Sequence, residues 1–275
     1  PQRFTGGVER VIDYLRAGDV FQVNLSRRWE AGFAAPLSPF ALYARLRVAN
    51  PAPFAGLFVG QGRAVVSSSP ERLVSVHGEM VQTRPIAGTR PRGLNPDGTV
   101  NHELDTRMEL ELRTDAKEIA EHTMLVDLAR NDLARVAEPR TRKVRDLLQV
   151  DRYSRVMHLV SRVTATLAPD LDALDAYRAC MNMGTLTGAP KLRATELLRA
   201  VEGERRGSYG GAVGYLRGNG DFDTCIVIRS AFVADGVATV QAGAGVVRDS
   251  NPQAEADETL HKAYAVLQAL AGERE

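Results

Sequence analysis

The C-terminal part of the sequence combines residue types that could bind and transform an anion. Gly243 and Gly245 leave no side chain between the backbone N–H groups and an approaching anion. The helix predicted after them carries Glu255, Glu258 and Lys262 at spacings of three and four residues, so all three can share one face. A backbone anion cradle beside two carboxylates and an ammonium group predicts a ligand site.

A second Glu-x-x-Glu pair, Glu118 and Glu121, lies on another predicted helix. Either acid alone is more often a solvated surface residue, and Asp115-x-x-Glu118 is close to a capping box. Two such pairs would repel each other if they converged, unless a cation lay among them. Oxygen ligands without a cysteine or histidine cluster favour Mg²⁺ over Zn²⁺.

Three further side chains allow a functional and a structural interpretation. His158 lies in an apolar predicted strand, where a histidine is more often a hydrogen-bonded core residue than a catalyst. Arg229 ends an apolar run and needs either an anionic partner or access to water. The hydroxyl of Tyr209 could bind a ligand or cap the end of a strand. The glycines at 243 and 245 do not form a dinucleotide-binding fingerprint, because the third glycine is missing.

Periodicity predicts strands that return as hairpins, with few strand–helix–strand crossovers. We therefore expect an α+β fold with two large antiparallel β-sheets packed as a sandwich, helices outside, and a single domain over residues 1–275. The glycine-, proline- and arginine-rich residues 85–98 and residues 184–189 are predicted to be loops, and residues 225–233 a continuous strand.

Composition excludes several classes of protein. The 275 residues carry a net charge of +1, with 44% hydrophobic and 25% charged residues, which indicates neither a nucleic-acid-binding nor a membrane-binding surface. No apolar run could span a bilayer, and no signal peptide is evident, so a cytoplasmic location is the expectation. Cys180 and Cys225 are too few for a disulfide framework. The start at Pro1 suggests a fragment or a processed chain.

The segments that carry these residues resemble the chorismate-utilising enzymes along nearly the whole chain. The matching segments are Gly18–Val23, Pro85–Gly93, Lys117–His122, Leu128–Asp132, Val150–Ser154, Gly207–Tyr215, Gln241–Gly245 and Glu255–Glu258. Within the family, the anthranilate synthase component I branch is the most similar.

The resemblance implies Mg²⁺-dependent amination of chorismate by ammonia, followed by elimination of pyruvate to form anthranilate in tryptophan biosynthesis. By resemblance, Mg²⁺ bridges the substrate's ring carboxylate to Glu121 and Glu258. The catalytic residues implied are His158, Glu118, Thr89, Glu255 and Lys262. The substrate-binding residues implied are Gly88, Thr89, Thr185, Tyr209, Arg229, Gly243, Ala244 and Gly245.

One position separates the branches of the family. The best-known aminodeoxychorismate synthases carry a nucleophilic lysine where this sequence has Ala87, so alanine favours the anthranilate branch. In contrast, the segment Asn24–Trp29 is more similar to aminodeoxychorismate synthase component I. Further alternatives are a non-catalytic chorismate-binding fragment and an isochorismate or salicylate synthase, which uses water in place of ammonia.

The resemblance also predicts the nitrogen source. Neither cysteine lies in a glutaminase nucleophile loop, so free ammonia or a separate glutamine amidotransferase subunit must supply nitrogen. Full-length relatives carry an N-terminal region that this chain lacks. We expect no nucleic-acid and no membrane partner.

Overall fold

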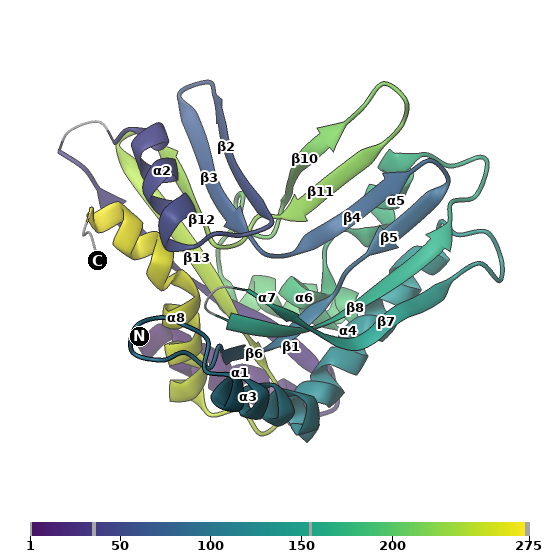
Figure 1. Cartoon of the computed structure of the whole chain (residues 1–275), viewed down its shortest axis with the longest axis horizontal. Helices are drawn as coiled ribbons and strands as arrows, with labels where there is room; N and C mark the ends of the chain where they lie inside the picture. Colours follow the sequence, from purple (N-terminus) through teal and green to yellow (C-terminus); the bar gives the residue numbers. More distant parts are fainter. Residues whose placement is uncertain (1, 35–36, 154–155, 273–275) are drawn as a thin grey trace. The chain divides into compact units, whose positions relative to one another are not determined.

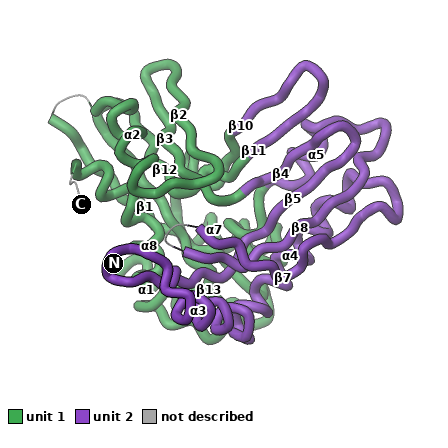
Figure 2. The backbone as a smooth tube through the Cα atoms, viewed as in Figure 1, with its two compact units in different colours: residues 1–71, 182–213, 225–275 green, residues 72–181, 214–224 purple. Residues whose placement is uncertain are grey.

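The computed structural model describes residues 2–34, 37–153 and 156–272. Pro1, and Ser154 of the matching segment Val150–Ser154, lie outside the described residues. The chain divides into two compact units, shown in green and purple in Figure 2. Unit 1 comprises residues 1–71, 182–213 and 225–275, and unit 2 comprises residues 72–181 and 214–224.

Unit 1 is built on a six-stranded antiparallel sheet of strand order β2-β3-β12-β13-β1-β9 (Figure 1). Its strands are β1 (Gln22–Gly32), β2 (Phe54–Gly60), β3 (Arg63–Ser69), β9 (Gly188–Ala189), β12 (Ser230–Ala234) and β13 (Val237–Val246). Its helices are α1 (Gln2–Arg16), α2 (Pro39–Ala49), α6 (Gly184–Thr187), α7 (Lys191–Glu202) and α8 (Pro252–Ala271).

Two apolar clusters join these helices to the sheet. Val8 and Val11 of α1 pack with Val23 and Leu25 of β1, in a cluster that also contains leucines of α7. A second cluster joins α2 and α8 to β3, β12 and β13. The amphipathic stripe of α1 is thus explained by burial against the sheet. Ser38 caps α2, as the Ser-Pro start of this helix predicts.

Unit 2 carries the second sheet, of strand order β10-β11-β4-β5-β8-β6, with β7 paired to β8. Its strands are β4 (Arg72–His77), β5 (Met80–Thr83), β6 (Ile86–Pro91), β7 (Lys143–Arg152), β8 (Val156–Thr166), β10 (Ala212–Leu216) and β11 (Phe222–Ile226), of which residues 212–213 and 225–226 are assigned to unit 1. Its helices are α3 (His102–Thr114), α4 (Ala116–Ala134) and α5 (Ala173–Cys180). Asp115 ends α3 and caps α4 with its side chain, so the two acidic helices follow each other directly.

Four local predictions are wrong or incomplete. Residues 86–91 form strand β6 because they pair with β8, which overrides a composition typical of loops. The strand expected over residues 225–233 is interrupted between β11 and β12, where Arg229 has φ of 51°. The loop expected over residues 184–189 contains the one-turn helix α6 and the short strand β9. Strand β7 was not expected at all.

The predicted α+β class with two antiparallel sheets is confirmed. The packing of the sheets as a sandwich and the single domain stay predictions. None of the helices in the described ranges combines the length and apolar character that a membrane span requires.

Candidate active site

In unit 2 the structure brings Gly88, Thr89 and His158 together. Thr89 lies opposite His158 in the β6–β8 ladder, and its Oγ1 is 3.1 Å from His158 Nδ1. The same nitrogen is 3.2 Å from the carbonyl oxygen of Gly88. The ring of Tyr153 meets the imidazole edge-on, with 5.7 Å between ring centroids. These contacts fix the imidazole beside a strand whose Thr89 is exposed.

The hydrogen bonds of His158 indicate how it could move a proton. A carbonyl oxygen only accepts, so the contact with Gly88 favours a proton on Nδ1. Nε2 is then the basic nitrogen of the neutral ring. In this tautomer His158 can accept a proton through Nε2 and return it at a later step.

The segment that carries Thr89 is irregular. The β6–β8 register shifts between Ala87 and Thr89, and Gly88 adopts a left-handed φ of 67°. A Cβ at position 88 would lie 2.8 Å from Leu112 Cδ1 and 3.1 Å from Glu118 Oε2. Glycine is therefore required both by the backbone conformation and by the close approach of α3 and α4. Ala87 is half-buried and lies opposite Leu159.

The two acids of α4 have different partners. Arg90 donates to Glu118 Oε1 at 3.0 Å and to Asp115 Oδ2 at 2.8 Å, which ties α4 to β6. The backbone N–H of Glu118 and the charge of Arg90 lower the pKa of Asp115. Glu121 lies one turn further on, with Oε1 3.7 Å from Lys117 Nζ. Asp115 caps the helix as expected, while the side chain of Glu118 reaches Arg90.

In unit 1 the glycines of β13 face the polar side chains of β1. Gly243 pairs with Ser26, and Gly245 with Asn24. A Cβ at position 243 would lie 2.3 Å from Asn24 Oδ1, and one at position 245 would lie 2.4 Å from Gln22 Nε2. The expectation of open space above both glycines is therefore wrong, because two buried amide side chains occupy it. Asn24 Oδ1 and Gln22 Oε1 accept no hydrogen bond from the described residues, so each can accept one from a bound molecule.

Tyr209 reaches the same strand. Its hydroxyl would be 2.9 Å from a Cβ at position 243 and accepts a hydrogen bond from the Gly243 N–H. Burial raises the pKa of Tyr209, although Arg206 and Arg229 act in the opposite direction. The phenol is therefore a neutral hydrogen-bond donor at physiological pH, as a carboxylate ligand requires.

Arg229 has the environment of an anion-binding residue. Burial lowers its pKa from the ordinary value, while Tyr209 and the carboxylates of Glu71 and Glu258 raise it. No carboxylate within the described ranges forms an ion pair with its guanidinium, in contrast to Arg206, which is 2.6 Å from Glu202. A half-buried arginine without such a partner favours an anionic ligand over the structural ion pair.

The acids of α8 lie beside this strand. Lys262 Nζ donates to the Gly243 carbonyl at 3.1 Å and to Glu258 Oε1 at 2.5 Å. Glu255 is buried in the first turn of α8, where the helix dipole favours a negative charge. The structure thus joins Lys262, Glu258, Gly243 and Tyr209 in one network, of which the helical spacing predicts only the contact between Glu258 and Lys262.

Two other predicted residues are less directly placed. Ala244 is fully buried and alternates with the glycines, so its methyl group points to the opposite face of the sheet. Thr185 lies in α6, and its Oγ1 is buried without a hydrogen-bond partner in the described part of the chain. Both stay predictions as substrate-binding residues.

The metal site also stays a prediction. No group of three or more His, Cys, Asp and Glu residues that could hold a metal occurs among the residues that the structure describes. Glu121 belongs to unit 2 and Glu258 to unit 1, and each carboxylate has a lysine neighbour. Magnesium is usually bound by one or two carboxylates together with water and substrate oxygens, so these donors fit it chemically.

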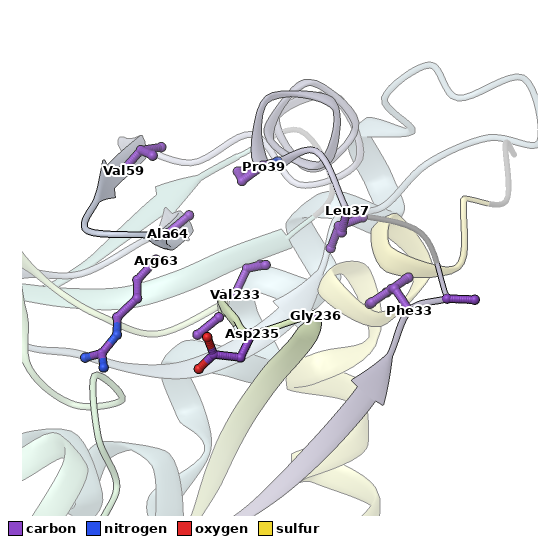
Figure 3. Close-up of a pocket in the computed structure, with 12 residues that line it drawn as sticks. Phe33, Leu37, Pro39, Val59, Arg63, Ala64, Val233, Asp235 and Gly236 are labelled. Atoms are coloured by element: carbon purple, nitrogen blue, oxygen red, sulfur yellow. The ribbon is translucent and has the colours of Figure 1, made fainter.

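A cavity of about 480 Å³ lies elsewhere in unit 1, where the turn between β2 and β3 and the turn between β12 and β13 meet the end of β1 (Figure 3). Its lining is mainly apolar, with Phe33, Leu37 and Val233, and includes the charged residues Arg63 and Asp235. None of the predicted site residues lines it.

The sequence did not point to several residues that lie near the candidate site residues of unit 1 and unit 2. Gln22, Asn24 and Ser26 alternate with apolar residues, a period that predicts a half-buried strand, whereas all three polar residues are buried. Another is His122, which is fully buried and hydrogen-bonded to Ser161. Burial lowers the pKa of His122 to about 4. A histidine directly after Glu121 was a signal that could have been followed.

Comparison with known proteins agrees with this arrangement. The family model for chorismate binding enzymes matches residues 1–268. The chain is 61% identical over 266 residues to anthranilate synthase component 1 of Vibrio cholerae, covering 96% of this chain and 50% of that protein. It thus spans about half the length of the curated relatives it matches.

Solved structures show the same fold. The anthranilate synthase component I of Streptococcus pneumoniae superimposes with a TM-score of 0.87 at 41% identity, covering 97% of this chain and 57% of that one. The menaquinone-specific isochorismate synthase of Escherichia coli superimposes with a TM-score of 0.84 at 25% identity, covering 98% and 60%. The chain belongs to the chorismate binding enzyme family.

Proposed function

We propose that this chain converts chorismate and ammonia to anthranilate, pyruvate and water. The observation that carries the proposal is the 61% identity to an anthranilate synthase component 1 over nearly the whole chain. The side chains of the two units supply complementary chemistry. Unit 1 offers groups that bind anions, and unit 2 offers a histidine that can move a proton.

Chorismate is a dianion, and unit 1 has the groups to hold its carboxylates. Arg229 can bind one carboxylate through two N–H groups, and Tyr209 can donate its hydroxyl proton. The amide side chains of Gln22 and Asn24, which lie over Gly245 and Gly243, add polar groups without adding charge. The charge of Arg229 is available because no carboxylate of the described chain neutralises it by direct pairing.

The reaction needs proton transfers that His158 can perform. A carbon–nitrogen bond forms as ammonia attacks the ring, and the carbon–oxygen bond of the ring hydroxyl breaks as water leaves with an added proton. In the second stage the ring loses a proton, the bond to the enolpyruvyl oxygen breaks, and pyruvate gains a proton. His158 is positioned by Gly88 and Thr89 to give and take such protons.

Mg²⁺ is part of the proposal. Glu121 and Glu258 are the carboxylates that would hold it, with Glu118 and Glu255 completing the acidic set. When bound, the ion would neutralise the negative charge of the ring carboxylate.

The nitrogen donor is proposed to be ammonia delivered by a separate glutamine amidotransferase subunit. Cys180 and Cys225 are both buried, so neither thiol offers the accessible nucleophile that glutamine hydrolysis requires. Ala87 favours direct attack by ammonia, since its methyl group cannot act as a nucleophile.

One assay separates this function from its alternatives. The chain is incubated with chorismate, MgCl₂ and an ammonium salt at alkaline pH, where more neutral ammonia is present, and products are identified by mass spectrometry. Anthranilate with pyruvate supports the proposal. Aminodeoxychorismate, with nitrogen incorporated and pyruvate retained, would assign the other aminating branch. Isochorismate would assign the chemistry of the more distant relative, and bound, unchanged chorismate would indicate a non-catalytic module.

The variant Ala87→Lys sharpens the assay. A lysine beside the irregular Gly88 segment would place a competing amine where ammonia is expected to attack. We expect loss of anthranilate formation, and mass spectrometry of the variant tests for a covalent adduct with the ring. Anthranilate production at the parent rate would show that position 87 does not select the branch.

A further inference from the structure

Ser161 lies at the point where β8 is irregular on both edges. On one edge β5 ends its pairing at Thr83↔Val163, and β6 begins at Ile86↔Val160. On the other edge the β7 register shifts between Arg145 and Gln149. Ser161 therefore has no regular ladder partner on either side, and its hydrogen bonds must be made in other ways.

Three hydrogen bonds converge on this buried serine. Its N–H donates to the Pro85 carbonyl at 3.2 Å, at the entry to β6. Its Oγ accepts from the Leu148 N–H at 3.0 Å and lies 2.7 Å from His122 Nε2. Ser161 and His122 both have 0% of their surface exposed, so water cannot replace these bonds. His122 thereby ties α4 to the two irregular segments that adjoin β8.

A short series of contacts connects the His122–Ser161 hydrogen bond to the candidate catalytic residues. Leu148 holds a left-handed φ of 55°, and its side chain packs in the cluster that contains Leu112. Leu112 in turn restricts the space at Gly88, whose carbonyl contacts His158. The peptide of Leu148 is held on both sides, because its carbonyl accepts from Arg113 Nη1 at 3.1 Å.

We propose that His122 is a positioning residue: through Ser161 it holds α4 and the Leu148 bulge in the arrangement that places Gly88, Thr89 and His158 for turnover. The proposal rests on the proposed function, since it assigns His122 a part in that reaction. His122 touches none of the proposed catalytic or substrate-binding side chains. Its replacement therefore alters the rate of the chemical step and leaves the affinity for chorismate nearly unchanged.

The test compares five variants of the 275-residue chain, four single variants and the double variant His122→Leu/Ser161→Ala. His122→Leu removes the hydrogen bond and keeps apolar bulk, His122→Gln keeps a polar group that can reach Ser161, and Ser161→Ala removes the other partner. Val126→Ala is the matched control, because Val126 is buried one turn further along α4 and carries no polar side-chain atom. For each variant, kcat and KM for chorismate, Tm and hydrogen exchange of the Leu148 amide are measured.

We expect His122→Leu and Ser161→Ala to lower kcat about ten- to a hundredfold, as small misplacements of catalytic groups do, with KM changed less than about threefold. His122→Gln recovers kcat to within a few-fold. The double variant His122→Leu/Ser161→Ala is no slower than either single variant, because both remove the same interaction. Exchange of the Leu148 amide quickens in His122→Leu and Ser161→Ala and stays slow in Val126→Ala.

Two results would overturn the proposal. One is parental kcat in His122→Leu. The other is an equal loss of kcat in Val126→Ala at an equal loss of Tm, which would make the effect one of stability alone. If the parent chain forms no anthranilate, the proposed function fails. The structural role of the His122–Ser161 hydrogen bond is then judged by hydrogen exchange of the Leu148 amide. Unchanged protection of this amide in His122→Leu refutes that role, and a selective loss of protection supports it.

Discussion

The candidate residues of unit 1 lie on a regular sheet, whereas those of unit 2 lie at irregularities. The β1–β13 ladder runs from Val23↔Val246 to Gly32↔Val237 without a register shift. In unit 2, β6 shifts register against β8 beside Gly88 and Thr89, which contact His158, and β7 shifts register between Arg145 and Gln149. Regular strand pairing holds several ligand-binding groups in fixed positions. A local register shift changes the orientation of a single side chain.

The chemistry of the two groups differs in the same way. Unit 1 presents Arg229 and Tyr209, which we propose bind the substrate's carboxylates, and burial raises the pKa of the Tyr209 phenol so that it keeps its proton near neutral pH. Unit 2 presents His158, whose two ring nitrogens can exchange a proton. Variants of the two units can therefore test substrate binding and proton transfer separately.

The largest effect is expected from Arg229→Ala. Removing a half-buried guanidinium that holds a carboxylate should lower kcat/KM by about a thousandfold, mostly through KM. Arg28→Ala is the control, because Arg28 forms surface ion pairs with Glu30 and Glu204. Steady-state kinetics with chorismate measure both. A loss confined to kcat would remove the distinction between the units.

Next in size is His158→Ala. General acid–base catalysis contributes roughly a hundred- to ten-thousandfold, so kcat should fall within that range while KM stays within a few-fold of the parent. Thr89→Ala, which removes only the hydroxyl near Nδ1, should have a smaller effect of the same kind. A variant with a large rise in KM and an unchanged kcat would place His158 among the binding groups instead.

Metal removal tests the proposed roles of Glu121 and Glu258 as magnesium ligands. Excess chelator is expected to abolish turnover, and Glu121→Gln or Glu258→Gln should each raise the Mg²⁺ concentration for half-maximal rate about tenfold or more. Glu111→Gln, on an exposed acid paired with Arg107, is the control. Full turnover in chelator would contradict the metal assignment.

The smallest effect concerns acid stability of unit 2. The Arg92 hydrogen bond lowers the pKa of the buried Asp105 carboxyl. A folded-state pKa below the unfolded value of about 3.9 means that the stabilisation is complete above that value and is lost as pH falls through the folded pKa. We expect Tm to fall with pH below about 4, and Asp105→Asn to flatten this dependence.

The control for this prediction is Asp97→Asn. The pKa of Asp97 is also lowered, by hydrogen bonds from Thr99, but the residue is exposed at a loop. Its replacement should leave the acid dependence of Tm nearly unchanged. An equal change in both variants would show that burial of the Arg92–Asp105 pair does not matter.

Local patterns predicted much of this molecule. The stripe of α1 and the Ser38 cap of α2 follow from periodicity and capping chemistry, which act over a few residues. The spacing of Glu258 and Lys262 likewise predicted their contact on α8. Features that depend on one turn of helix were within reach of the sequence.

Long-range strand pairing could not be predicted from the sequence. Residues 86–91 become a strand only because β8, about seventy residues later, accepts them, and no local propensity encodes that partner. The alternation along β1 predicts a strand with one buried face, but it does not reveal that Asn24 fills the space above Gly243. The position of Ser161 between two irregular ladders likewise arises from three separate segments meeting.

The central claim is that unit 1 binds chorismate and unit 2 performs the proton transfers that convert it to anthranilate. Isothermal titration of chorismate in the presence of Mg²⁺, into Arg229→Ala and His158→Ala, tests it most directly when anthranilate is assayed on the same samples. We expect His158→Ala to bind chorismate with nearly the parental Kd and to form almost no anthranilate, while Arg229→Ala loses measurable binding. Loss of binding in His158→Ala with retained binding in Arg229→Ala would contradict it.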